Sequence, residues 1–220
     1  CSNRTQCPRV GARFGQADPH RLAVMTVGPH PQPWPDDPRL DPELLAAGDT
    51  RNVEDRFRYW RREAIIAELD RSRHPLHVAI ENFQHDFNIG SVVRTANAFN
   101  VAGVHIIGKR RWNRRGAMVT DRYQHVEHHP LSSDLLTLGL PLIGIDNVPG
   151  SVPLEGAALP QACVMIFGQE GPGLSPESLV LCQTVLHITQ FGSTRSINAG
   201  AAAAIAMWSW ALQWAPPDGE

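Results

Sequence analysis

Five short apolar runs alternate with segments of helical spacing, and this alternation constrains the fold of the chain more than any other sequence feature. Each run is bounded by polar or glycine-containing turns, as is typical of buried strands. The expected strands are Leu76–Ile80, Val104–Ile107, Leu142–Ile145, Cys163–Phe167 and Thr184–Ile188. The expected helices are Gly90–Phe99, Ser132–Leu138, Pro176–Leu181 and Asn198–Trp214. Strands that alternate with helices predict an α/β fold, with a mostly parallel sheet flanked by helices on both faces.

The part of the chain before these elements is organised differently. It contains eight prolines in its first fifty residues, with little apolar periodicity, so we expect a weakly ordered arm there. Val53, Phe57 and Trp60 then begin an apolar pattern at helical spacing that ends near Ser72, with arginines between the apolar residues. The expected divisions are a proline-rich arm at 1–50, an amphipathic arginine-bearing helix within 51–73, a globular domain at 74–215 and a tail at 216–220.

Composition argues against several classes of protein. With 42% hydrophobic and 19% charged residues, the 220 residues can bury one substantial core. No apolar run approaches the roughly 20 residues that span a bilayer, and no signal peptide pattern is present, so we expect a cytoplasmic protein without a membrane partner. The four cysteines are Cys1, Cys7, Cys163 and Cys182. They form no C-x-x-C pair and have no nearby histidine at zinc-finger spacing, so we predict neither a metal site nor redox chemistry.

Basic residues are concentrated although the net charge is only −2. One arginine cluster lies in residues 56–62, and a second surrounds Trp112. The second cluster consists of Lys109, Arg110, Arg111, Arg114 and Arg115. Arginine suits bidentate phosphate contacts and stacking on bases, so we predict that this cluster binds RNA rather than forming a merely solvated loop.

Polar residues follow the first expected strand. The loop Glu81–Ile89 leads into a helix that carries Arg94 in its first two turns. Asn88 is suited either to cap that helix or to contact a substrate. Arg94 is flanked by Val92 and Val93, so its permanent charge needs an anion, either in a buried salt bridge or in a bound phosphate.

Two later strand-to-helix loops have the same character. In the glycine-rich turn Gly168–Glu177, Ser175 fits a helix N-cap, and Glu170 is either a functional carboxylate or an ordinary exposed one. In the last loop, Ser196 and Asn198 precede an alanine-rich helix. Capping accounts for one of these two residues, whereas a ligand accounts for both.

Together the three segments resemble the SpoU (TrmH-like) family, the RNA ribose 2'-O-methyltransferases of the SPOUT superfamily. The patterns are N-x-G-x-x-x-R-T-A, G-x-E-x-x-G and S-L-N, in that order, and the resemblance covers about residues 74–214. The matching residues are Asn88, Gly90, Arg94, Thr95 and Ala96 in the first, Gly168, Glu170 and Gly173 in the second, and Ser196, Ile197 and Asn198 in the third.

The resemblance implies a SPOUT fold whose C-terminal part forms a deep trefoil knot and binds S-adenosylmethionine. The implied cofactor-binding residues are Ile145, Gly168, Gly173, Ile188 and Ile197. It also implies a homodimer, for which Ile205, Trp208 and Leu212 on the last helix would supply a surface unless they pack in the core.

The resemblance further implies methyl transfer to a ribose 2'-hydroxyl that Arg94 activates. Because a guanidinium is almost never deprotonated, we expect Arg94 to stabilise the developing charge and to contact the adjacent phosphate. Asn88, Glu170, Ser196 and Asn198 would orient Arg94, ribose and cofactor. The proton would leave through phosphate, water or a neighbour such as His85. Arg195, which stands where many members have an acidic residue, adds a phosphate contact. We expect an RNA substrate, tRNA before rRNA; the alternatives are a catalytically silent RNA-binding relative and a methyltransferase that acts on a base.

Overall fold

The computed structural model describes residues 26–82, 86, 88–169 and 171–215. By their contacts, the residues group into two compact units, Cys1–Arg61 and Arg62–Glu220. Residues 1–25 of the expected arm and the whole expected tail lie outside the described residues.

The first unit is organised around a buried aspartate. Its helix α1 (Pro42–Ala47) begins at Asp41, whose side chain accepts a hydrogen bond from the backbone N–H of Glu43. The carboxylate of Asp49 is fully buried and accepts from the backbone and guanidinium of Arg51 and from the backbone N–H of Tyr59. Burial alone would raise the pKa of Asp49, but these hydrogen bonds lower it to about 2.

The prediction of an amphipathic helix within 51–73 is wrong for the first half of that range. The structure has a short 3-10 helix η2 (Asp55–Phe57), an irregular segment, and then the helix α2 (Arg62–Asp70). Tyr59 adopts a left-handed backbone with a φ of 62°, which a helix cannot contain. Its N–H is held by Asp49 and its carbonyl accepts from the N–H of Asp41, so tertiary hydrogen bonds override the local apolar spacing.

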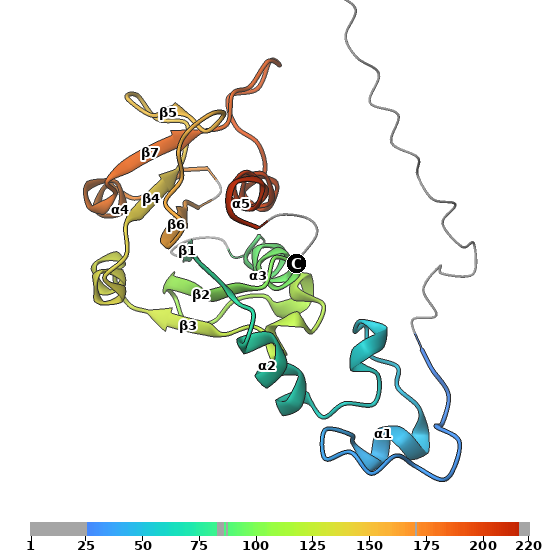
Figure 1. The fold of residues 1–220 in the computed structure, drawn as a ribbon. Coiled ribbons are helices and arrows are strands. Elements are labelled where there is room, and N and C mark those ends of the chain that lie inside the picture. Colours follow the sequence, from blue (N-terminus) through green and yellow to red (C-terminus); the bar gives the residue numbers. More distant parts are fainter. Residues whose placement is uncertain (1–25, 83–85, 87, 170, 216–220) are drawn as a thin grey trace, which may run out of the picture. The chain divides into compact units, whose positions relative to one another are not determined.

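The second unit contains a seven-stranded sheet in the order β3-β2-β1-β6-β4-β7-β5, and every neighbouring pair is parallel (Figure 1). The strands are β1 (His74–Asn82), β2 (Val101–Gly108), β3 (Val126–His129), β4 (Leu142–Ile145), β5 (Val152–Pro153), β6 (Cys163–Phe167) and β7 (Thr184–His187). All five predicted strands are present. The two that were not predicted, β3 and β5, are short edge strands with no fully buried residue, so they lack an apolar signal.

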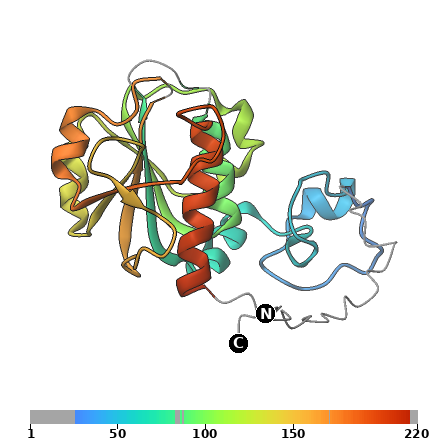
Figure 2. The same ribbon diagram turned by 90° about the horizontal axis from the view of Figure 1, so that it is seen from above.

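Helices cover both faces of the sheet, as predicted. The helices α3 (Ile89–Ala98) and α5 (Ala199–Trp214) pack together on one face, and the 3-10 helix η5 (Ser132–Leu138) and α4 (Pro176–Leu181) pack together on the other (Figure 2). Two further 3-10 helices, η3 (Arg114–Ala117) and η4 (Thr120–Arg122), contact α3. No described helix is both long enough and apolar enough to cross a membrane.

The last helix divides its apolar residues between core and surface. Met207 and Trp210 are buried, and the indole N–H of Trp210 donates to backbone carbonyls of the segment before β6. Ile205, Trp208 and Leu212 are 41%, 54% and 66% exposed. Core packing therefore does not account for these three side chains.

Candidate functional site

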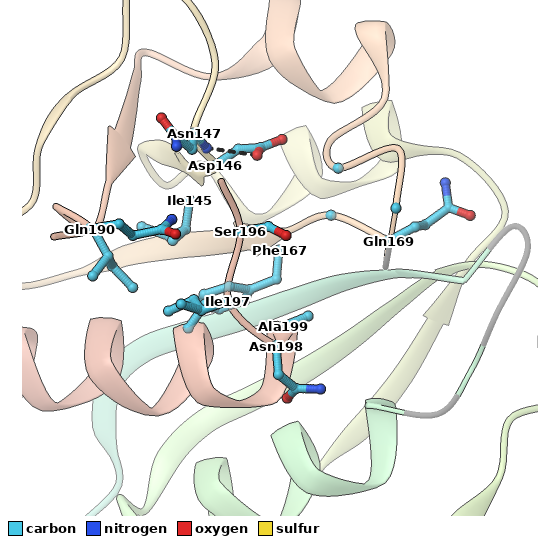
Figure 3. Close-up of a pocket in the computed structure, with 15 residues that line it drawn as sticks. Ile145, Asp146, Asn147, Phe167, Gln169, Gln190, Ser196, Ile197, Asn198 and Ala199 are labelled. Atoms are coloured by element: carbon cyan, nitrogen blue, oxygen red, sulfur yellow. Dashed lines mark hydrogen bonds between the residues drawn. The ribbon is translucent and has the colours of Figure 1, made fainter. Parts of the chain in front are cut away.

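A cavity of about 270 Å³ lies where the carboxyl ends of β4, β6 and β7 meet the start of α5 (Figure 3). This edge of a parallel sheet is where open α/β folds bind ligands. The residues that line the cavity are Ile145, Asp146, Asn147, Phe167, Gly168, Gln169, Gly171, Gly173, Ile188, Gln190, Ser196, Ile197, Asn198, Ala199 and Ala202. The structure thus brings together all five residues to which the resemblance assigned the cofactor, and with them Ser196 and Asn198.

The glycine-rich turn forms one wall of the cavity. Gln169 and Gly173 exchange two backbone hydrogen bonds of 3.0 and 3.1 Å, which close the turn. A Cβ at Gly168 would collide with the backbone of Gly173, and Gly173 itself has a φ of +74°. Only glycine fits this turn without strain at both positions.

Asp146 is a cavity residue that the sequence did not single out. Its carboxylate accepts from the backbone N–H of Asn147 (Figure 3) and from that of Leu174, both at 2.7 Å, so it ties the end of β4 to the glycine-rich turn. A Cβ at Gly173 would collide with this carboxylate. The available sequence signal was an acidic residue immediately after a fully apolar strand.

Glu81, at the end of β1, is a second residue that the sequence did not single out. It is buried, and its carboxylate accepts from the backbone N–H and hydroxyl of Ser175 and from the hydroxyl of Ser178. The Ser178 hydroxyl also bonds with that of Ser132. Ser175 caps α4 as predicted. Glu81 therefore anchors the end of the turn and the start of α4 to β1.

Asn198 links two of the three sequence segments. Its side-chain oxygen accepts from the N–H groups of Gly200 and Ala201 and so caps α5, while its amide nitrogen donates to the side-chain oxygen of Asn88 across 2.8 Å. The expected capping of α3 by the Asn88 side chain is wrong, because Asn88 has a helical backbone and forms no such bond.

Arg94 lies on α3 with an exposed side chain and does not line the cavity. In the part of the chain that the structure describes, it forms no ion pair. A buried salt bridge is therefore not its role, and the guanidinium is accessible to an external anion. Glu170 and the suggested proton acceptor His85 lie outside the described residues.

The second arginine cluster forms a separate hollow. Arg110, Arg111, Trp112 and Arg114 line a space of about 390 Å³, and the guanidinium of Arg114 lies 5.6 Å from the centre of the Trp112 ring. The side-chain amide of Asn82 donates to two backbone carbonyls of this loop and fixes it beside the end of β1.

The other two arginines that were predicted to bind RNA do not line this hollow. Arg115 is exposed at the start of η3. Arg195 is exposed in the loop before α5, where its backbone carbonyl accepts from the amides of Asn147 and Gln190.

Two residues that line the cavity have buried side-chain oxygens without a partner among the described residues. The amide oxygens of Gln169 and Gln190 accept no hydrogen bond from any described residue. In Figure 3 the Gln169 side chain points away from the other labelled residues of the cavity. An unsatisfied buried acceptor costs about 1–3 kcal/mol. Because both oxygens are buried, neither is open to a ligand in the cavity with the side chains in these positions.

The model of the SpoU rRNA methylase family matches residues 75–208 of this chain. The chain belongs to the SpoU rRNA methylase family. The family predicted from the three sequence segments is thus confirmed.

Individual SpoU relatives align over most of the second unit. An uncharacterized tRNA/rRNA methyltransferase of Synechocystis sp. is 26% identical over 69% of this chain and 42% of its own length. The tRNA (guanosine(18)-2'-O)-methyltransferase of Escherichia coli K12 is 24% identical, over 67% of this chain and 68% of its own. The SpoU methyltransferase AviRb of Streptomyces viridochromogenes, solved in complex with AdoMet, has the same fold with a TM-score of 0.59 and 21% identity, over 66% of this chain and 63% of its own. The chain spans less than half the length of the first three curated relatives it matches.

Proposed function

We propose that this chain is an S-adenosylmethionine-dependent RNA methyltransferase that acts on a ribose 2'-hydroxyl, with tRNA favoured over rRNA. The observation that carries the proposal is the cavity at the carboxyl ends of β4, β6 and β7, which the second and third motifs line and which Asn198 links to the first. The name of the Escherichia coli relative, a tRNA 2'-O-methyltransferase, supports the ribose and the tRNA. The family name keeps rRNA as the second candidate.

The cavity residues fit the cofactor. Ile145, Ile188 and Ile197 supply apolar walls that suit an adenosine moiety. Gly168, Gly171 and Gly173 line the cavity, and without side chains they let a ligand approach their backbone closely. The AdoMet complex of AviRb, a protein of the same fold, supports this assignment. When bound, the cofactor supplies a methyl group on a cationic sulfur.

The residues of the chain then position and activate the hydroxyl. The Arg94 guanidinium stabilises the negative charge that develops on the 2'-oxygen and contacts the neighbouring phosphate. It stays protonated throughout, so the proton leaves through phosphate or water. Asn88 and Asn198 hold the starts of α3 and α5 together, and Ser196 adds a hydroxyl on the cavity wall. Glu170, within the glycine-rich turn, would add a carboxylate to these polar side chains.

The trefoil knot and the homodimer belong to the same proposal. Contacts between the segment after β4 and the last part of the chain support the knot: Asn147 and Glu155 hydrogen-bond with the loop before α5, and Leu159 bonds with Gln213 on α5. A crystal structure in which the backbone is unknotted would overturn the proposed trefoil knot. We propose the exposed apolar face of α5 as the dimer surface, which sedimentation of a Trp208→Glu variant would test.

The decisive experiment measures transfer of labelled methyl from S-adenosylmethionine to total tRNA and, separately, to rRNA, followed by nucleoside analysis. Arg94→Ala serves as the control. A 2'-O-methyl nucleoside in one pool, absent with the variant, is the expected result. A base-methylated nucleoside would identify a base-directed enzyme. No transfer despite cofactor binding would identify a silent RNA-binding relative.

A further inference from the structure

A row of histidines crosses the first three strands of the sheet on one face. His77 Nδ1 on β1 lies 2.9 Å from His105 Nε2 on β2, and His105 Nδ1 lies 2.8 Å from His129 Nε2 on β3. His105 is in register with Glu127 on β3, and residues two apart on a strand share a face, so the Glu127 carboxylate points to the same side as His129. Gly103 leaves room for this row, because a Cβ there would lie only 3.3 Å from His77 Nδ1.

Three atoms of this group surround one point. His105 Nδ1, His129 Nε2 and a Glu127 oxygen are separated by 2.8, 3.8 and 3.9 Å. A point equally distant from all three lies about 2.1 Å from each, which is the bond length of zinc to imidazole nitrogen and carboxylate oxygen. Two histidines and one carboxylate are also a donor set that zinc uses in proteins, with a further position left to water.

Hydrogen bonds between the rings account for the positions of the three imidazoles, but not for the position of the Glu127 carboxylate. At 3.8 and 3.9 Å, the Glu127 oxygen is too far from either ring nitrogen for a hydrogen bond. If the facing lone pairs of His105 and His129 both point to an ion, the remaining proton of His105 is on Nε2 and is donated to His77 Nδ1. Such a second hydrogen bond is how proteins orient a metal-binding histidine.

The burial of the group favours ligation as well. Because the His105 side chain is only 1% exposed, its ring cannot turn out to solvent. Glu127 is 61% exposed and leaves the group open to solvent on one side.

We propose that His105, Glu127 and His129 bind a divalent transition-metal ion of the zinc type, with His77 as the partner that orients His105. The site joins β3, the strand at the edge of the sheet, to β2, and it lies on other strands than those that form the cavity (Figure 1). Its role is structural: the ion stabilises the attachment of a four-residue edge strand that has little apolar surface of its own. The site is not recognisable in the sequence because its ligands come from two strands and include no cysteine.

The test uses the full chain, free of any purification tag and stripped of metal with a chelator, titrated with Zn²⁺ by calorimetry and with Co²⁺ by visible absorption. The expected result is one saturable equivalent, a Co²⁺ spectrum with nitrogen and oxygen ligands, and a melting temperature that rises with Zn²⁺. Glu127→Gln and His129→Ala should each weaken binding at least about tenfold.

His128→Ala is the matched control. His128 lies between the two ligands on β3, but it is in register with Ile106 and its Nε2 bonds the carbonyl of Gly108 at 2.7 Å, so it points to the opposite face. It should leave the affinity unchanged. If His129→Ala fails to fold, as far-UV circular dichroism would reveal, the exposed Glu127→Gln still tests the site. Absence of a saturable equivalent, equal binding by Glu127→Gln, or equal weakening by His128→Ala would each overturn the proposal.

Discussion

The side chains of Asn88 and Asn198, 110 positions apart in the sequence, share a hydrogen bond of 2.8 Å between the starts of α3 and α5. The same Asn198 side chain caps α5 through its oxygen, so its two ends have separate tasks. Figure 3 shows it extending from the beginning of α5 toward α3. This bond fixes the start of α3 relative to the start of α5, which lines the cavity.

Substitutions at Asn198 should separate these two tasks. Asn198→Asp keeps the capping oxygen but loses the N–H donated to Asn88, so it should leave the free energy of unfolding nearly unchanged while methyl transfer falls about tenfold or more. Asn198→Ala loses both bonds and should also destabilise the fold by about 1 kcal/mol. Urea unfolding and transfer assays on both variants provide the comparison. Full activity in Asn198→Asp would show that the link to Asn88 does not position the site.

The glycine-rich turn provides a second matched pair. Gly173→Ala would place a methyl group against the Asp146 carboxylate at a φ of +74°, so the turn must open and cofactor affinity should fall at least about tenfold. Gly171→Ala introduces a similar positive φ, +98°, with no atom within 4 Å of the new methyl. It should have a clearly smaller effect in calorimetric titration with S-adenosylmethionine. Equal losses would mean that backbone strain, rather than the contact with Asp146, determines affinity.

The anchoring carboxylate of Glu81 makes a separate prediction. Glu81→Gln replaces one acceptor oxygen with a donor, so at least one of the bonds from Ser175 and Ser178 must break in a buried site. The expected loss of stability is about 1–3 kcal/mol, measured by urea unfolding of the full chain. A Ser178→Ala variant removes only one donor and should cost less. A neutral effect of Glu81→Gln would contradict the anchoring role.

The sequence predicts the central strands and the family because those features are local. Apolar runs such as Cys163–Phe167 are buried on both faces, so their composition alone identifies them. Asp146 and Glu81 escaped prediction because their partners lie 28 and 94 positions away, and a lone acidic residue carries no sign of such contacts. Tyr59 escaped for the same reason, since the bond that bends its backbone comes from Asp49.

Asp49 should make the first unit sensitive to acid. Its folded pKa of about 2 lies below the ordinary value of 3.8, so the stabilisation is complete above about pH 5 and is lost as the pH falls toward 2. The contribution is about 2 kcal/mol. Comparing urea unfolding of the wild-type chain and Asp49→Asn at pH 6 and pH 2.5 isolates it: the wild-type advantage should shrink at the lower pH. An advantage that stays constant between the two pH values would mean that ionisation of Asp49 is not its source.

Arg94 provides the sharpest test of the chemistry, because it is exposed on α3 and does not line the cavity. Arg94→Ala should abolish methyl transfer, by about a hundredfold or more, yet leave the affinity for S-adenosylmethionine nearly intact. Arg94→Lys keeps the positive charge but loses the bidentate geometry, so it should recover only part of the activity. Single-turnover transfer to the RNA pool that the wild-type enzyme methylates, alongside calorimetric titration with the cofactor, measures both quantities. A parallel loss of transfer and cofactor affinity in Arg94→Ala would place Arg94 in cofactor binding instead of in stabilisation of the 2'-oxygen.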